Sequence, residues 1–251
     1  STSFESCVEE RDTVAQSTYT TIPSGAWDLD VNTIPSSDGT RWRPMWNELI
    51  YDRSSGRGYN NELNTNTNRS PTGSYWCPAP SSKLAERTRT DVEDYVNSLV
   101  ATGNTFHDLG MAWGVRLLSP NGLFASENTT APNGRPISRH IIFMTDGMIN
   151  TPPAMYSSHG YEESDRRVSS AAVTPSTSDL NSRHSARFQA LCNQARANNI
   201  TVWTIAFGTS NPSTLVTCAD SGKAYVATNS AALTAQFQQI AANIAKLRLS
   251  R

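Results

Sequence analysis

Long apolar runs are missing from this sequence. Of its 251 residues 37% are hydrophobic, but no apolar run approaches the roughly 20 residues that a membrane-spanning helix needs. The first ten residues, STSFESCVEE, also lack the basic and apolar stretches of a secretion signal. These absences argue against a membrane segment in this sequence, while the apolar content still allows a sizeable core.

An excess of charge of one sign is also missing. The chain has 21 basic and 22 acidic residues, so nothing predicts a polycationic surface. Nucleic acid and anionic membranes are therefore not expected as partners.

Cysteine is scarce and has no metal-binding spacing. The four cysteines are far apart, with no C-x-x-C pair and no histidine at ligand spacing, which argues against a zinc site built on them. Two disulfides fit better, and three pairings are possible. We favour Cys7 with Cys77 and Cys192 with Cys218, because each joins segments close in sequence; this implies an oxidising compartment. The alternative is four buried free thiols.

Polar residues, prolines and glycines dominate the first third of the chain. Residues 18–82 are rich in Asn, Ser, Thr, Pro and Trp, and we expect a long polar insert there. A second insert is expected at residues 148–181. No internal repeat is visible, and we interpret residues 1–251 as one domain.

Apolar spacing predicts two helices in the middle of the chain. Residues 90–100 begin with the capping-box pattern of Thr90 and Glu93. One face of this helix carries an apolar stripe, formed by Val92, Tyr95, Val96 and Leu99. Residues 106–120 predict a second helix that ends at Pro120. Four of its residues are expected to point inward, namely Leu109, Ala112, Trp113 and Leu117.

Two further helices are predicted nearer the C-terminus. Residues 181–199 place four residues at helical spacing, namely Phe188, Leu191, Cys192 and Ala195. Residues 230–249 predict the last helix, with Ser230 as its cap. Its apolar face contains Leu233, Phe237, Ile240, Ile244 and Leu247.

Three apolar segments predict strands. Residues 139–147 and 200–208 carry apolar side chains on both alternating faces, which is typical of strands buried on both sides. Residues 223–228 predict a shorter strand. Strands that alternate with helices in this way predict an α/β fold with a doubly wound, mostly parallel sheet. Ligand sites in such sheets lie at the carboxyl ends of the strands.

Thr105 and Asp146 are the candidate site residues. Taken alone, Asp146 with Gly147 is typical of a turn, and Thr105 is a loop threonine. Taken together, a hydroxyl before one helix and a carboxylate at the end of the next strand are expected to meet at one crevice of the sheet. Such hard oxygen donors favour Mg²⁺ or another divalent cation.

Several motifs of the chain resemble those of a known family. GNTFHDLGMAWG, HIIFMTDGMIN and ITVWTIAFG, followed by the closing helix, resemble the second half of a von Willebrand factor A domain. FESCVEER, HDLGMAWGVRLLSP, IIFMTDGMINT, the second cysteine pair and the terminal LRLSR are similar to the TadG-like pilus-assembly proteins of the tight adherence (Flp pilus) system. The resemblance covers most of the chain and is weakest over residues 18–82.

The resemblance implies a metal-ion-dependent adhesion site. Such a site takes a D-x-S-x-S motif, a threonine and an aspartate, and Thr105 and Asp146 match the second and third elements. The first element is missing, because Asp52, Ser54 and Ser55 have a different spacing and no helix pattern follows them. The family pattern places this motif and its strand upstream, so we expect the chain to begin partway through the domain. An ion would then bind weakly or not at all.

Three functions remain open at this point. The first is a non-enzymatic module that uses a divalent cation to bind an acidic side chain of a protein partner during Flp pilus assembly or anchoring. Asn104, His107 and Asn150 lie near the site residues in sequence and are candidates for its rim. The resemblance places this module at the periplasmic or extracellular face of a bacterial cell envelope, with a membrane anchor upstream.

The second function is a structural scaffold with a degenerate metal site, in which the two long inserts make the contacts. The third is a metal-dependent hydrolase. It is the least favoured, because the four histidines, His107, His140, His159 and His184, show no metal-ligand spacing, and no nucleophile elbow or phosphate-binding loop is present.

Overall fold

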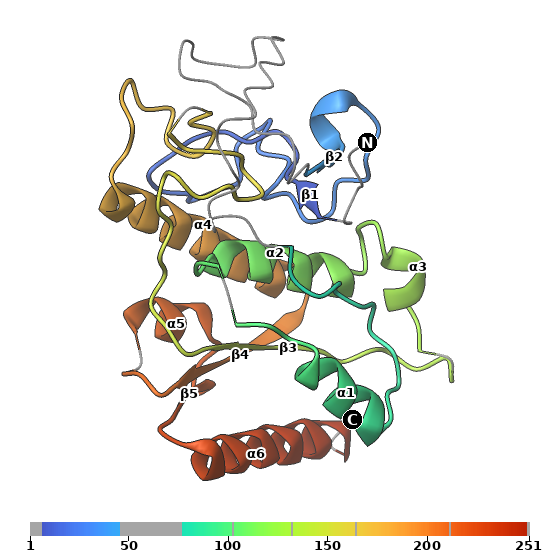
Figure 1. The fold of residues 1–251 in the computed structure, drawn as a ribbon. Coiled ribbons are helices and arrows are strands. Elements are labelled where there is room, and N and C mark those ends of the chain that lie inside the picture. The colour runs from blue at the N-terminus through green and yellow to red at the C-terminus, as the bar shows by residue number, and fades with distance from the viewer. Residues whose placement is uncertain are drawn as a thin grey trace.

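The fold is shown in Figure 1, a computed structural model that describes residues 7–45, 77–101, 103–131, 133–163, 165–210 and 212–249. The segment around Asp52 and the middle of the expected insert at 18–82 lie outside the described residues.

A parallel sheet forms the centre of the fold. Its strand order is β3 (Arg139–Thr145), β4 (Ile200–Phe207) and β5 (Ala224–Ala227), and both pairings are parallel. A separate antiparallel pair joins β1 (Val8–Glu9) to β2 (Arg43–Pro44). The described chain is therefore a mixed α/β structure with a parallel sheet, as the predicted alternation of strands with helices implies.

Helices cover both faces of the sheet. α2 (His107–Leu118) and α4 (Thr177–Ala197) lie on one face, and α6 (Ser230–Leu249) lies on the other (Figure 1). The larger apolar core lies under α2 and α4, and the smaller one contains Trp203, Ile205 and Ile240. The short helices are η1 (Asp38–Thr40), α1 (Arg89–Asn97), α3 (Ala125–Asn128) and α5 (Ser213–Cys218).

α4 and α6 keep most of their predicted faces. All four residues expected at helical spacing in α4 are buried. In α6, Ile240 is fully buried and Leu233 and Ile244 pack against the core, but Phe237 is 40% exposed. The cap of α6 is Asn229, not Ser230, because its side chain accepts the backbone N–H of Ala232 at 2.9 Å.

α1 and α2 differ from the prediction. The capping box of α1 is formed by Thr88 and Asp91, two residues before the expected pair. No residue of α1 is buried, so its apolar stripe is exposed. In α2 the inward residues are Met111, Ala112, Val115 and Leu118, and of the four expected ones only Ala112 is fully buried.

β3 is covered on one face only. Ile141 is 8% exposed, whereas Met144, on the opposite face, is 48% exposed. The expectation of a strand buried on both sides was therefore wrong for β3. The physical reason is its position, since among the described residues β3 pairs with β4 alone and no helix packs on the face that carries Ile142 and Met144.

The N-terminal segment and the second insert form an outer layer. Residues 7–45 and 151–176 lie over α2 and α4, on the side away from the sheet (Figure 1). Tyr19, Leu29 and Val31 reach the larger core from this layer. The side chain of Arg11 is buried in the same layer, where its guanidinium donates to the backbone carbonyls of Thr33 and Asp30. Residues 18–45 are thus ordered by contacts with the domain core.

Both disulfides are present. Cys7 is bonded to Cys77 and Cys192 to Cys218, which is the pairing that the sequence favours. The second bond ties α4 to the end of α5 within the core.

No helix in the described part of the chain combines the length and the apolar character that crossing a membrane requires.

Candidate functional site

The carboxyl edge of β3 presents Asp146 to solvent. Asp146 follows the last residue of the strand and is exposed. The turn behind it is held by Thr145, whose hydroxyl donates to the carbonyl of Gly147 at 3.2 Å and accepts its N–H at 3.3 Å. The buried ring of His107 lies against this turn, with Nε2 3.2 Å from the Thr145 hydroxyl. Asp146 therefore lies in a turn that these contacts hold in place.

Thr105 lies on the same edge. It forms an isolated antiparallel bridge with Asn150, through two backbone hydrogen bonds of 3.2 and 3.0 Å. The side chain of Asn150 donates to Asn104 Oδ1 at 2.9 Å, which ties the two loops together once more. The structure thus brings the loop of Thr105 beside the loop that follows Asp146.

The side-chain oxygens of the two expected ligands are free within the described residues. Neither the Thr105 hydroxyl nor the Asp146 carboxylate makes a hydrogen bond or an ion pair with any residue that the structure describes. One exposed carboxylate and one hydroxyl fit the few hard oxygen ligands that Mg²⁺ takes from a protein, the rest being water. Of the expected rim residues, Asn104 and Asn150 are exposed at this edge, whereas His107 is buried.

A second group lies deeper, between the helices and the outer layer. Asp108 comes from the first turn of α2, His184 from the middle of α4, and His159 from the second insert. All three are buried, and one ligand atom of each lies within 4.8 Å of the others. A buried Asp/His/His group of this kind could hold a metal ion.

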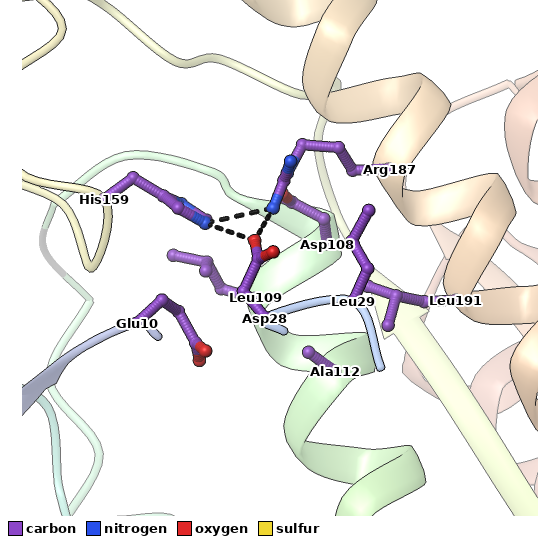
Figure 2. Close-up of a pocket in the computed structure, with 9 residues that line it drawn as sticks. All are labelled: Glu10, Asp28, Leu29, Asp108, Leu109, Ala112, His159, Arg187 and Leu191. Carbon is purple, nitrogen blue, oxygen red and sulfur yellow. Dashed lines mark hydrogen bonds and ion pairs between the residues drawn. The ribbon is translucent and has the colours of Figure 1, made fainter. Parts of the chain in front are cut away.

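Hydrogen bonds connect this group to Arg187 and Asp28. Asp108 Oδ2 lies 2.7 Å from His184 Nδ1 and 3.3 Å from Arg187 Nε. On the other side of the group, His159 Nε2 lies 3.0 Å from Asp28 Oδ2. Arg187 also forms an ion pair with Asp28 (Figure 2). Two histidine–carboxylate pairs are therefore joined by one guanidinium.

A cavity of about 10 Å³ lies beside Asp108 and His159, which is room for about one water-sized group, and His184 is not part of its lining. Its lining, drawn in Figure 2, is Glu10, Asp28, Leu29, Asp108, Leu109, Ala112, His159, Arg187 and Leu191. Three buried polar atoms of the lining have no hydrogen-bond partner, namely Asp28 Oδ1, Asp108 Oδ1 and His159 Nδ1. The cavity is too small for an organic substrate.

The surroundings favour a neutral His159 and a charged Glu10. Burial lowers the pKa of His159, and the charge of Arg167 lowers it further against the opposing pull of nearby carboxylates. Burial by itself raises the pKa of Glu10. The charge and hydrogen bonds of Arg116 outweigh burial, so that the pKa of Glu10 lies below its ordinary value. Arg116 reaches both carboxylate oxygens of Glu10, at 2.7 and 2.9 Å.

The sequence predicted the position of Asp146 at the end of β3 and gave no prediction of the buried group. Its members are far apart in the chain and follow no metal-binding spacing. One signal was available, since His184 and Arg187 share the inward face of α4 with Phe188 and Leu191 at helical spacing. A charged or titratable residue on an apolar face needs a buried partner.

Comparison with models of known protein families, with curated proteins and with solved structures gives no match for this chain.

Proposed function

We propose that this chain is a non-enzymatic protein-binding module of the von Willebrand factor A type, which depends on a divalent cation. In this proposal it acts at the periplasmic or extracellular face of a bacterial envelope, in the assembly or anchoring of a TadG-type Flp pilus. The motif resemblance supports the family and the setting, and the two disulfides support an oxidising compartment.

The observation that carries the proposal is the exposed carboxylate of Asp146 at the end of a parallel strand. Ligands of α/β sheets bind at this edge. The bridge between Thr105 and Asn150 supports the proposal, because it joins the Thr105 loop to the loop that follows Asp146. The hydrogen bonds between Thr145 and Gly147 hold the backbone on both sides of Asp146 in place. This lowers the entropy cost of binding an ion.

The proposed chemistry is coordination without a covalent step. Asp146 would supply a charged oxygen and Thr105 a neutral one to a bound Mg²⁺, and water would supply the other ligands. An acidic side chain of the protein partner would take the place of one water. The affinity for the partner then depends on the ion, because the ion cancels the repulsion between two carboxylates.

The unpaired edge of β3 is consistent with the proposed type of domain. In that type a further strand lies beside β3, which among the described residues pairs with β4 alone. The three-stranded parallel sheet with helices on both faces agrees with this type at the level of fold class.

One observation favours a second candidate, a scaffold without a working metal site at the edge. The outer layer is fastened to α2 and α4 by buried ion pairs, among them Glu10 with Arg116 and Asp28 with Arg187. Such a rigid outer layer is suited to carrying partner contacts without any ion.

Calorimetric titration with Mg²⁺ separates the two candidates. The full-length protein should bind Mg²⁺, Asp146→Ala should abolish the binding, and Asp38→Ala should leave it unchanged. Asp38 is the matched control because its carboxylate is 98% exposed and lies on η1, in the outer layer. Absence of Mg²⁺ binding, or equal binding by the Asp146 variant, would favour the scaffold.

A further inference from the structure

We propose that Asp108, His159 and His184 bind one transition-metal ion, with zinc as the best fit, which fastens the second insert to α2 and α4. This site is separate from the edge of β3 and does not depend on the function proposed for it. Two imidazoles and one carboxylate are a ligand set that suits zinc, whereas Mg²⁺ prefers oxygen ligands alone.

The geometry is close to that of a metal centre. Zinc bonds of about 2.0–2.2 Å place tetrahedral ligand atoms roughly 3.4 Å apart. The three ligand atoms here lie within 4.8 Å of one another. Asp108 Oδ2 and His184 Nδ1 share a hydrogen bond of 2.7 Å, which metal bonds to these two residues would replace. A small inward movement of His159, which sits on the insert and not on a helix, completes the set.

Two members of the group have unmet bonding capacity. In neutral imidazole one nitrogen donates and the other carries a lone pair. His159 Nε2 contacts the Asp28 carboxylate, so it donates there and leaves the lone pair on Nδ1, a buried atom without a partner. Asp108 Oδ1 is a second buried atom without a partner, and both residues line the small cavity. A metal ion, with or without one water, would supply what these atoms lack.

Asp28 and Arg187 have the positions of supporting residues. A histidine that binds zinc typically donates its other nitrogen to a carboxylate, which fixes the ring. Asp28 would do this for His159, and Arg187 holds Asp28 and Asp108 in turn. Their role is to position the ligands.

The competing account is that Arg187 alone balances the cluster. Both accounts place the proton of His159 Nε2 toward Asp28, at 3.0 Å, with the Arg187 donor 3.1 Å from the same nitrogen. The competing account differs in that it leaves the lone pair of His159 Nδ1 unused.

The test measures metal content and coordination in the full-length protein. Elemental analysis after dialysis against trace zinc should give one zinc per chain. His159→Gln and His184→Gln should weaken zinc binding at least about tenfold, the lower range for loss of even a supporting residue. His140→Gln is the matched control, because His140 lies on β3 outside the cluster, and Asp146→Ala should also keep its zinc.

A second measurement uses the unmodified protein, so it does not require any variant to fold. Cobalt substituted into the unmodified protein should give the visible absorption of a four-coordinate site with nitrogen and oxygen ligands, and zinc should displace it. Absence of zinc and of a cobalt spectrum in the folded protein would overturn the proposal in favour of an ion-pair cluster centred on Arg187. Zinc bound equally by the folded His159 and His184 variants would overturn it as well, since the ion would then sit elsewhere.

Discussion

Glu10 and Arg116 form a buried ion pair with two hydrogen bonds, of 2.7 and 2.9 Å, and each side chain is 2% exposed. This pair joins the outer layer to α2, so it holds together two parts of the chain that are distant in sequence. Removal of one partner leaves an uncompensated buried charge.

Glu10→Gln should therefore destabilise the protein strongly. We expect a loss of about 3–5 kcal/mol in the free energy of unfolding, measured with chemical denaturant. The double variant Glu10→Leu with Arg116→Met should recover most of this loss, because no charge remains unpaired. The exposed pair of Arg89 and Glu93 is the control, and Glu93→Gln should cost no more than about 0.5 kcal/mol. A loss below about 1 kcal/mol for Glu10→Gln would contradict the role given to this pair.

His107 should make stability depend on pH near neutrality. Burial is the main cause that lowers the pKa of His107 in the folded state, and Asp108 opposes it in part. Below the ordinary histidine pKa of about 6.5, the unfolded chain therefore binds more protons than the folded one. The contribution of His107 is complete above that pH and is lost as the pH falls toward the folded pKa.

His107→Gln should accordingly flatten the decline in unfolding free energy between about pH 7 and pH 5. Urea denaturation of both proteins across this range measures the effect. His159 adds a decline of the same sign and is unchanged in the variant, so it cancels in the difference. Parallel curves for the two proteins would show that His107 carries no such linkage.

Removal of the disulfide between Cys192 and Cys218 should lower stability. The bond closes a loop with a sequence separation of 26, for which chain entropy predicts about 3–4 kcal/mol. The double variant Cys192→Ala with Cys218→Ala should show this loss by denaturation under oxidising conditions. A reductant should lower the stability of the unmodified protein at least as far, because it also breaks the bond between Cys7 and Cys77. No loss of stability in the double variant would contradict the role given to the bond.

The apolar stripe of α1 should tolerate charge. Val96 is 55% exposed, so Val96→Lys should change the free energy of unfolding by about 0.5 kcal/mol or less. The same variant should reduce the binding of a hydrophobic dye to the native protein. Val115→Lys is the contrast, because Val115 is fully buried in α2 and its replacement should prevent folding. A large destabilisation by Val96→Lys would mean that α1 is covered.

Apolar patterns in the sequence predicted the parallel strands and the buried face of one long helix. The apolar runs around Ile141 and Val202 predicted the parallel strands, and the spacing of Phe188 and Leu191 predicted the buried face of α4. The exposure of α1 was not predictable, since an apolar stripe shows which face prefers burial and not whether a partner is present. Met144 was misjudged for the same reason.

The candidate site divides in a similar way. The position of Asp146 at a strand end was predictable from the apolar run before it, and its role as a ligand stays a prediction. The group of Asp108, His159 and His184 was not predictable, because its members meet only after the insert folds back over α2 and α4. Sequence spacing carries no information about such a contact.

The central claim is that a divalent cation binds at the carboxyl edge of β3. Anomalous diffraction from crystals of the full-length protein grown with Mn²⁺ locates such an ion directly. The account predicts an anomalous peak about 2.0–2.4 Å from a carboxylate oxygen of Asp146, close to Thr105. Ordered density for Asp146 with no peak beside it would contradict the claim.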